Sequence, residues 1–106
     1  MENNISRIEL LYFKECPSWK KALSNLEEII QELDINNEII MINVETNEDA
    51  IKYEFTGSPT IKVNGKDIFP TEQNNYALGC RIYKTPKGYK GSPTKEMISE
   101  RLSKLT

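Results

Sequence analysis

The spacing of apolar residues changes twice between residues 7 and 44, and this change restricts the chain to a small set of folds. Residues 7–13 are apolar on both faces of an alternating pattern, which is typical of a buried strand. In residues 22–33 the apolar side chains recur at helical spacing, with charged residues between them. Residues 38–44 then carry an aliphatic run that predicts a second strand covered on both faces. Together these segments predict a βαβ unit with a right-handed crossover.

A short helix and a hairpin are expected in the middle of the chain. Thr46 or the residue after it can cap the helix, and Gly57 suits the left-handed turn that ends it. Asn64 and Gly65 form the dipeptide best fitted to both positive-φ positions of a type I′ turn. The segments on either side of this dipeptide therefore predict a hairpin with strands at residues 60–63 and 66–69.

The last third of the chain has weaker patterns. Residues 70–79 show little periodicity and predict a loop, followed by a short strand at residues 81–83 and a second loop. Ser92 and Pro93 supply a cap and first-turn pair for a final helix. No repeat or linker divides the chain, so we predict one α/β domain over residues 1–106. Its expected centre is a mixed four-stranded sheet with flanking helices. The expected order is β-α-β-α-β-β, then an insertion with a short strand, then a last helix.

Composition excludes several classes of function. The formal net charge is −2, with acidic and basic residues mixed along the chain, so we expect neither a nucleic-acid nor a membrane partner. The longest aliphatic run covers only residues 39–42, and the amino-terminal residues lack a secretion signal, which favours a cytoplasmic location. The chain has no histidine, which excludes serine triads and Cys/His pairs. Two thiols alone do not fill a zinc site, so we expect no cofactor.

Two short motifs stand out against this order of elements. Residues 13–19, which contain Cys16 and Pro17, lie between the first strand and the first helix. Residues 57–60, Gly-Ser-Pro-Thr, lie directly before the hairpin. This arrangement resembles the thioredoxin and glutaredoxin superfamily, whose active-site loop and cis-proline segment occupy these two places. The resemblance implies a single thioredoxin-like domain; it covers residues 7–69 and, after an insertion at about 70–91, the last helix. More narrowly, the chain resembles small thioredoxin-like proteins that are sometimes labelled relatives of alkylmercury lyase.

Cys16 is the first candidate catalytic residue. At the amino end of a helix its sulfur meets unpaired backbone N–H groups and the positive end of the helix dipole, which favour a thiolate. We expect this sulfur to be exposed and nucleophilic. The alternative is a small buried packing residue, since unoxidised cysteine is among the most buried residue types. The superfamily's second cysteine, three residues on, is replaced here by Trp19.

Cys80 is the second candidate catalytic residue. The loop before it can carry it to the end of the sheet where Cys16 lies, and there it would resolve a mixed disulfide. Equally, Cys80 can pack under the loop at the start of a strand, because the pairing of cysteines is not readable from sequence. Arg81 beside it can hold a thiolate or an anionic substrate.

The resemblance also implies a substrate surface beside Cys16. It implies a cis bond before Pro59, so that the backbone of Ser58 can pair with an extended substrate. Thr60 and Pro17 belong to the same two motifs, and Trp19 is the best candidate for an apolar groove wall.

Three functions remain open at this point. The first is thiol redox chemistry in which Cys16 attacks a disulfide, and Cys80 or an external thiol resolves the product; its partners would be protein or low-molecular-weight thiols and disulfides. The second is binding of a soft metal or organomercurial by Cys16 and Cys80. For lyase catalysis the acidic proton donor is missing, since Trp19 stands where it would be wanted and Glu15 is the only nearby substitute. The third is a binding module that keeps the scaffold without catalysis.

Overall fold

A mixed sheet of four strands forms the centre of the computed structural model, which describes residues 4–71 and 75–106. The strands are β1 (Ile8–Tyr12), β2 (Ile39–Asn43), β3 (Thr60–Val63) and β4 (Lys66–Asp67), in the spatial order β2-β1-β3-β4. β1 pairs in parallel with β2 and antiparallel with β3, and β3 pairs antiparallel with β4. The predicted mixed four-stranded sheet is therefore confirmed.

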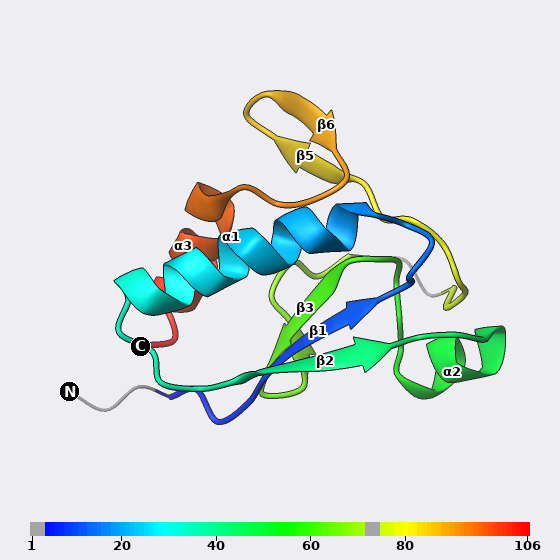
Figure 1. Cartoon of the computed structure of the whole chain (residues 1–106), viewed down its shortest axis with the longest axis horizontal. Coiled ribbons are helices and arrows are strands. Elements are labelled where there is room, and N and C mark those ends of the chain that lie inside the picture. The colour runs from blue at the N-terminus through cyan, green and yellow to red at the C-terminus, as the bar shows by residue number, and fades with distance from the viewer. Residues whose placement is uncertain (1–3, 72–74) are drawn as a thin grey trace.

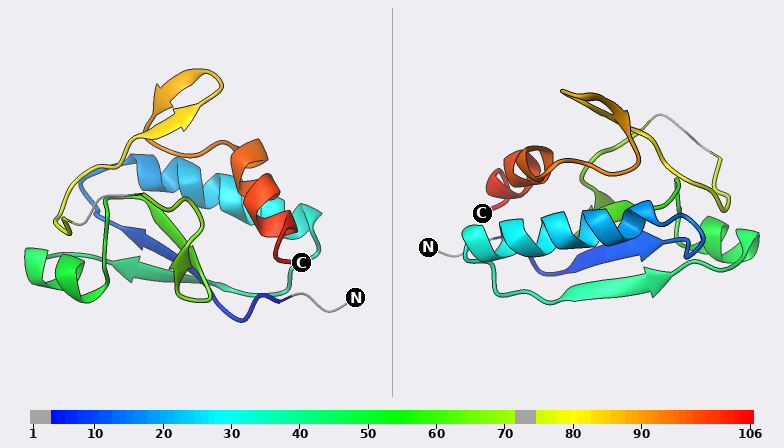
Figure 2. Two further views of the ribbon diagram at one scale, coloured as in Figure 1. Left: turned by 180° about the vertical axis from the view of Figure 1, so that it is seen from behind. Right: turned by 45° about the horizontal axis from the view of Figure 1, so that its top comes forward.

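Within the described residues, three helices accompany the sheet (Figures 1 and 2). α1 (Ser18–Glu32) connects β1 to β2 and packs together with α3 (Lys95–Ser103) on one face. α2 (Asn47–Lys52) follows β2 and contributes to the opposite face. The predicted βαβ unit is confirmed. Across residues 4–71 and 75–106, none of these helices is long and apolar enough to cross a membrane.

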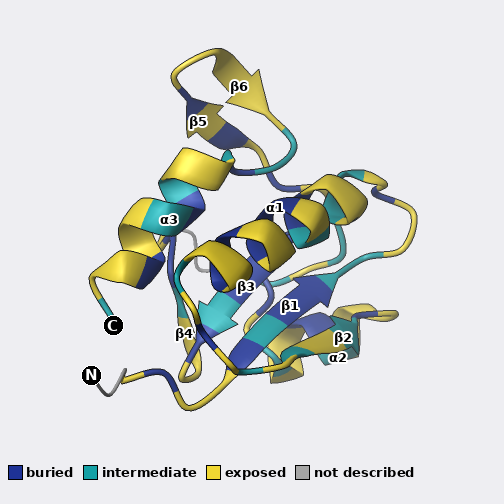
Figure 3. Ribbon diagram, turned by 60° about the vertical axis from the view of Figure 1, so that its left-hand side comes forward, coloured by how far each residue is buried: buried dark blue, intermediate teal, exposed yellow. Residues whose placement is uncertain are grey.

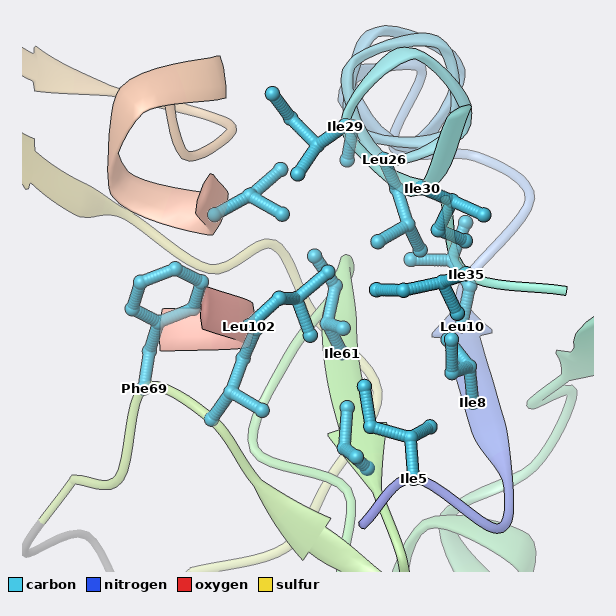
Figure 4. Packing of buried hydrophobic residues seen from close by; sticks show 14 of the residues in the cluster. Ile5, Ile8, Leu10, Leu26, Ile29, Ile30, Ile35, Ile61, Phe69 and Leu102 are labelled. Carbon is cyan, nitrogen blue, oxygen red and sulfur yellow. The ribbon is translucent and has the colours of Figure 1, made fainter. Parts of the chain in front are cut away.

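β1 separates two apolar cores because its successive side chains point to opposite faces. Ile8 and Leu10 pack with the residues of α1 and α3, and Figure 4 shows Leu26 and Leu102 among the side chains that meet there. Leu11 points the other way, into a smaller cluster formed by Val44, Ala50 and Phe55. β1 is thus fixed from both sides, and with it the loop that follows, which carries Cys16.

β2 differs from its prediction. It is the edge strand of the sheet, and Ile40 and Met41 are exposed, with relative accessibilities of 44% and 38%. Figure 3 shows this contrast between the largely buried β1 and the more open β2. The expectation of cover on both faces is wrong because an aliphatic run does not show how far the helices extend over the outermost strand, where Ile40 and Met41 point to opposite faces and both stay open.

The tight turn of the first hairpin is as predicted. Asn64 and Gly65 both have positive φ, +55° and +83°, as a type I′ turn requires. The Asn64 side chain also fixes the approach to β1, since its Oδ1 accepts hydrogen bonds from the backbone N–H groups of Ser6 and Arg7.

The last third of the chain needs two corrections. β5 (Tyr83–Thr85) and β6 (Gly88–Lys90) form a second hairpin where the sequence predicted a strand at residues 81–83 and a loop. Three-residue strands are too short to produce a readable alternation. The final helix is capped by Thr94, whose Oγ1 accepts from the Met97 N–H, and not by Ser92. Within the predicted loop at 70–79, residues 72–74 lie outside the described residues.

Candidate functional site

A disulfide joins Cys16 to Cys80, although the two residues are 64 positions apart. Their Cα atoms are 5.8 Å apart, which is within the range that such a bond allows. The prediction that the insertion carries Cys80 to the end of the sheet beside Cys16 is confirmed, and packing under the loop is not what the structure shows.

The amino end of α1 lies directly after Cys16. The Cys16 N–H donates to the Phe13 carbonyl at 2.9 Å, which closes a turn between β1 and the helix. Pro17 occupies the N-cap position, no side chain caps the first turn, and no acidic residue stands in it. Within the first turn of α1, no capping side chain or acidic residue therefore offsets the positive end of the helix dipole.

The two cysteines differ in exposure. Cys16 is only 3% exposed, whereas Cys80 is an exposed residue. The expectation of an exposed Cys16 is therefore wrong for the disulfide form. The burial of Cys16 depends on which segments pack around it in space, and the local sequence pattern does not show this.

The peptide bond between Ser58 and Pro59 is cis, as the resemblance implied. The backbone of Ser58 is nevertheless already paired within the chain. Its N–H donates to the Gly79 carbonyl and its carbonyl accepts from the Arg81 N–H, both at 2.9 Å, which makes a parallel bridge with Cys80. The segment around Cys80 thus lies where an extended substrate was expected.

Arg81 anchors this segment to the sheet. Its side chain is 6% exposed, and its Nη1 lies 2.7 Å from Asp67 Oδ2. Nη2 donates to the Phe69 carbonyl, and Nη1 also lies 3.4 Å from Thr60 Oγ1. The guanidinium is therefore directed into the protein and not toward a thiolate or substrate. Nothing in the sequence marks Asp67 as its partner, because that pairing depends on the register of the hairpin.

Tyr83 adds a second anchor. Its hydroxyl donates to the Pro59 carbonyl at 2.5 Å, and the Arg81 guanidinium lies 4.6 Å from its ring centroid. Burial raises the pKa of the Tyr83 hydroxyl, an effect that the nearby Arg81 charge partly opposes. The hydroxyl therefore remains protonated and keeps donating to Pro59 throughout the neutral pH range.

The remaining residues predicted to bind substrate differ in solvent exposure. Ser58, Pro59 and Thr60 are buried, so they do not present a surface in the disulfide form. Pro17 is exposed and Trp19 is half-buried, with its ring centroid 4.5 Å from that of Tyr12. Of the predicted groove, only the wall formed by the first turn of α1 is accessible.

An open pocket of about 390 Å³ adjoins the disulfide on the Cys80 side. Gly57, Gly79, Cys80 and Ile82 are among its lining residues, and Cys16 is not. Of the two cysteines, it is therefore Cys80 that this pocket borders.

Gly57 permits the close contact between the cis-proline segment and the Cys80 segment. A Cβ at this position would lie 2.9 Å from Arg81 Cβ, and the φ angle of +121° is strained for other residues. We expect Gly57→Ala to lower the free energy of unfolding by about 2 kcal/mol. The measurement is urea unfolding of the oxidised protein. Gly79→Ala is the matched control, since its Cβ would meet no atom within 4 Å; equal losses in the two variants would contradict this account.

Soft-metal binding, the second function considered, would use the same two sulfurs. Among residues 4–71 and 75–106, no group of three or more His, Cys, Asp or Glu side chains is placed to hold a metal ion. Cys16 and Cys80 would become available to a soft metal only after reduction of their disulfide.

Comparisons with known proteins add no assignment. No protein-family model, curated protein sequence or solved structure significantly matches this chain.

Proposed function

We propose that this chain is a thiol–disulfide exchange protein whose redox pair is Cys16 and Cys80. The observation that carries the proposal is their disulfide, which joins an uncapped helix terminus to a separately anchored segment 64 residues away. In the thioredoxin-like superfamily that the sequence resembles, the second thiol lies within the helix turn. Here Cys80 would take the role of that second thiol, and Trp19 occupies its position in the sequence.

The dithiol form would reduce a substrate disulfide in two steps. The Cys16 thiolate attacks one sulfur of the substrate, forming a mixed disulfide and releasing the other substrate sulfur as a thiolate. Cys80 then loses its proton and attacks Cys16, which forms the internal disulfide and releases the second substrate thiolate. The substrate gains two electrons and the protein loses two.

The anchoring of Cys80 supports the second step. The Ser58 hydrogen bonds and the Arg81–Asp67 ion pair do not involve either sulfur. These contacts can therefore keep Cys80 near Cys16 in both redox states, which makes its attack effectively unimolecular.

The expected cytoplasmic location agrees with a redox role. In a reducing compartment, disulfides are usually transient and serve catalysis or redox sensing. The proposed partners are accordingly protein or low-molecular-weight thiols and disulfides.

Exchange with glutathione tests the proposal. We expect the disulfide to open and close reversibly as the ratio of reduced to oxidised glutathione is varied. At pH 7, the dithiol protein should reduce a disulfide-bonded peptide about threefold faster than free cysteine does, because the larger ionised fraction of its thiol outweighs the lower nucleophilicity of a more acidic thiolate. Acid quenching, alkylation and mass spectrometry measure both the redox equilibrium with glutathione and the rate of reduction.

Cysteine variants complete this test. Cys16→Ser should abolish the rapid reaction, whereas Cys80→Ser should leave a mixed disulfide on Cys16. A disulfide that does not open at any glutathione ratio would identify a structural cross-link. Stoichiometric Hg(II) binding by the dithiol without exchange activity would favour the metal-binding alternative.

A further inference from the structure

We infer that reduction of the oxidised protein proceeds by attack of an external thiolate on Cys80, with Cys16 as the leaving group. This inference rests on the proposed function and assigns the sulfur used in its return half-reaction. The helix-terminal cysteine, which would attack the substrate, would thus not be the one that meets the reductant.

Access to the sulfurs carries the first step of the argument. Thiol–disulfide exchange requires the thiolate to approach one sulfur from the side opposite its partner. Approach to Cys16 is closed, since that residue is 3% exposed, whereas Cys80 is exposed. The 390 Å³ pocket lies on the Cys80 side and leaves room for the incoming group.

The quality of Cys16 as a leaving group also favours attack of the external thiolate on Cys80. Exchange is faster when the departing thiol has a lower pKa. Cys16 precedes an α1 terminus without a capping side chain or an acidic residue, so the helix stabilises its developing negative charge. Cys80 lies on an irregular segment and has no helix beside it in the chain. Attack at Cys80 therefore expels the better of the two leaving groups.

Local charge also favours an approaching anion. Residues 80–95 contain five basic residues and no acidic one, and two of the five are paired with acidic residues outside this stretch, Arg81 with Asp67 and Lys95 with Glu28. Lys84, Lys87 and Lys90 are exposed on or between β5 and β6. The base of this hairpin lies against the start of α1, where a Cβ at Gly91 would overlap Ser18 Oγ (Figure 1). The positive potential of this hairpin should draw a thiolate toward the site.

The atoms and electrons balance over two exchanges. A thiolate RS⁻ bonds to Cys80 Sγ, the internal S–S bond breaks, and the Cys16 thiolate leaves. A second RS⁻ then attacks the R-bearing sulfur of the mixed disulfide, which releases the Cys80 thiolate and RSSR. Two thiols are oxidised and the protein disulfide gains two electrons.

Trapping of the mixed disulfide tests the inference on the unmodified protein. Oxidised protein is mixed with glutathione, and in parallel with excess 2-mercaptoethanol, and quenched within seconds by a fast alkylating agent. Peptide mapping then locates the thiol adduct and the alkylated cysteine. We expect the adduct on Cys80 and alkylation on Cys16, in at least about tenfold excess over the reverse pattern, from the difference in access. A predominant adduct on Cys16, or equal amounts on both, would overturn the inference.

Comparing the reactions with glutathione and with 2-mercaptoethanol separates this inference from the proposed function. An adduct on Cys80 that forms only with excess 2-mercaptoethanol would support the direction of attack and count against a role in exchange. Rapid reaction with glutathione at Cys16 would support a role in exchange and would overturn the inferred attack on Cys80. If no adduct forms even with excess 2-mercaptoethanol, both proposals fail.

Discussion

Reduction of the Cys16–Cys80 disulfide is expected to lower the free energy of unfolding by about 4 kcal/mol. The bond closes a loop over 64 residues of a 106-residue chain, so it restricts the unfolded state strongly. For a domain of this size the loss corresponds to a fall of roughly 15–30 °C in the midpoint of thermal unfolding. Urea unfolding with and without a non-thiol reductant measures the difference.

The Cys16→Ser, Cys80→Ser double variant is the control for this result. Its stability should match that of the reduced protein and should not respond to reductant. A loss below about 1 kcal/mol would show that the unfolded chain is hardly constrained by the bond. The magnitude also bears on function, because the dithiol form must remain folded after losing a large part of the 5–15 kcal/mol that is typical of a small domain.

The fold was readable where local patterns were long or chemically specific. The change of period around residues 7–44 predicts β1, α1 and β2, and the Asn64 and Gly65 pair predicts the turn between β3 and β4. The parts that sequence did not predict depend on neighbours in space. β2 has an apolar sequence but no neighbour on one edge, and β5 and β6 are too short to show an alternating pattern.

The candidate site was predictable only in part, for a similar reason. The position of Cys16 before a helix follows from the local pattern, and so does the motif that contains Pro59. The pairing of Ser58 with the Cys80 segment does not follow from any local pattern. It joins residues that are 22 positions apart, and the insertion between them has no periodicity. The burial of Cys16 was not readable either, because it depends on the segments that pack around that residue in space.

Arg81→Ala is expected to destabilise the oxidised protein by about 3–5 kcal/mol. Both charged groups of the Arg81–Asp67 pair are largely buried, with side-chain exposures of 6% and 17%. Loss of the guanidinium leaves the Asp67 carboxylate and the Phe69 carbonyl without this partner, and an unpaired buried charge costs more than the ion pair contributed. Urea unfolding at neutral pH measures the loss, and Lys84→Ala, at an exposed position of β5, should stay within about 0.5 kcal/mol of the parent protein.

The position of Arg81 makes this substitution informative about the redox pair as well. Its backbone N–H holds Ser58 and its side chain holds Asp67, so the residue fixes both sides of the segment that presents Cys80. Without the side-chain anchor, Cys80 should spend less time near Cys16 in the dithiol form, and the glutathione equilibrium should move toward that form by about tenfold. A variant that is destabilised while its glutathione equilibrium stays unchanged would show that Arg81 supports the fold without positioning Cys80.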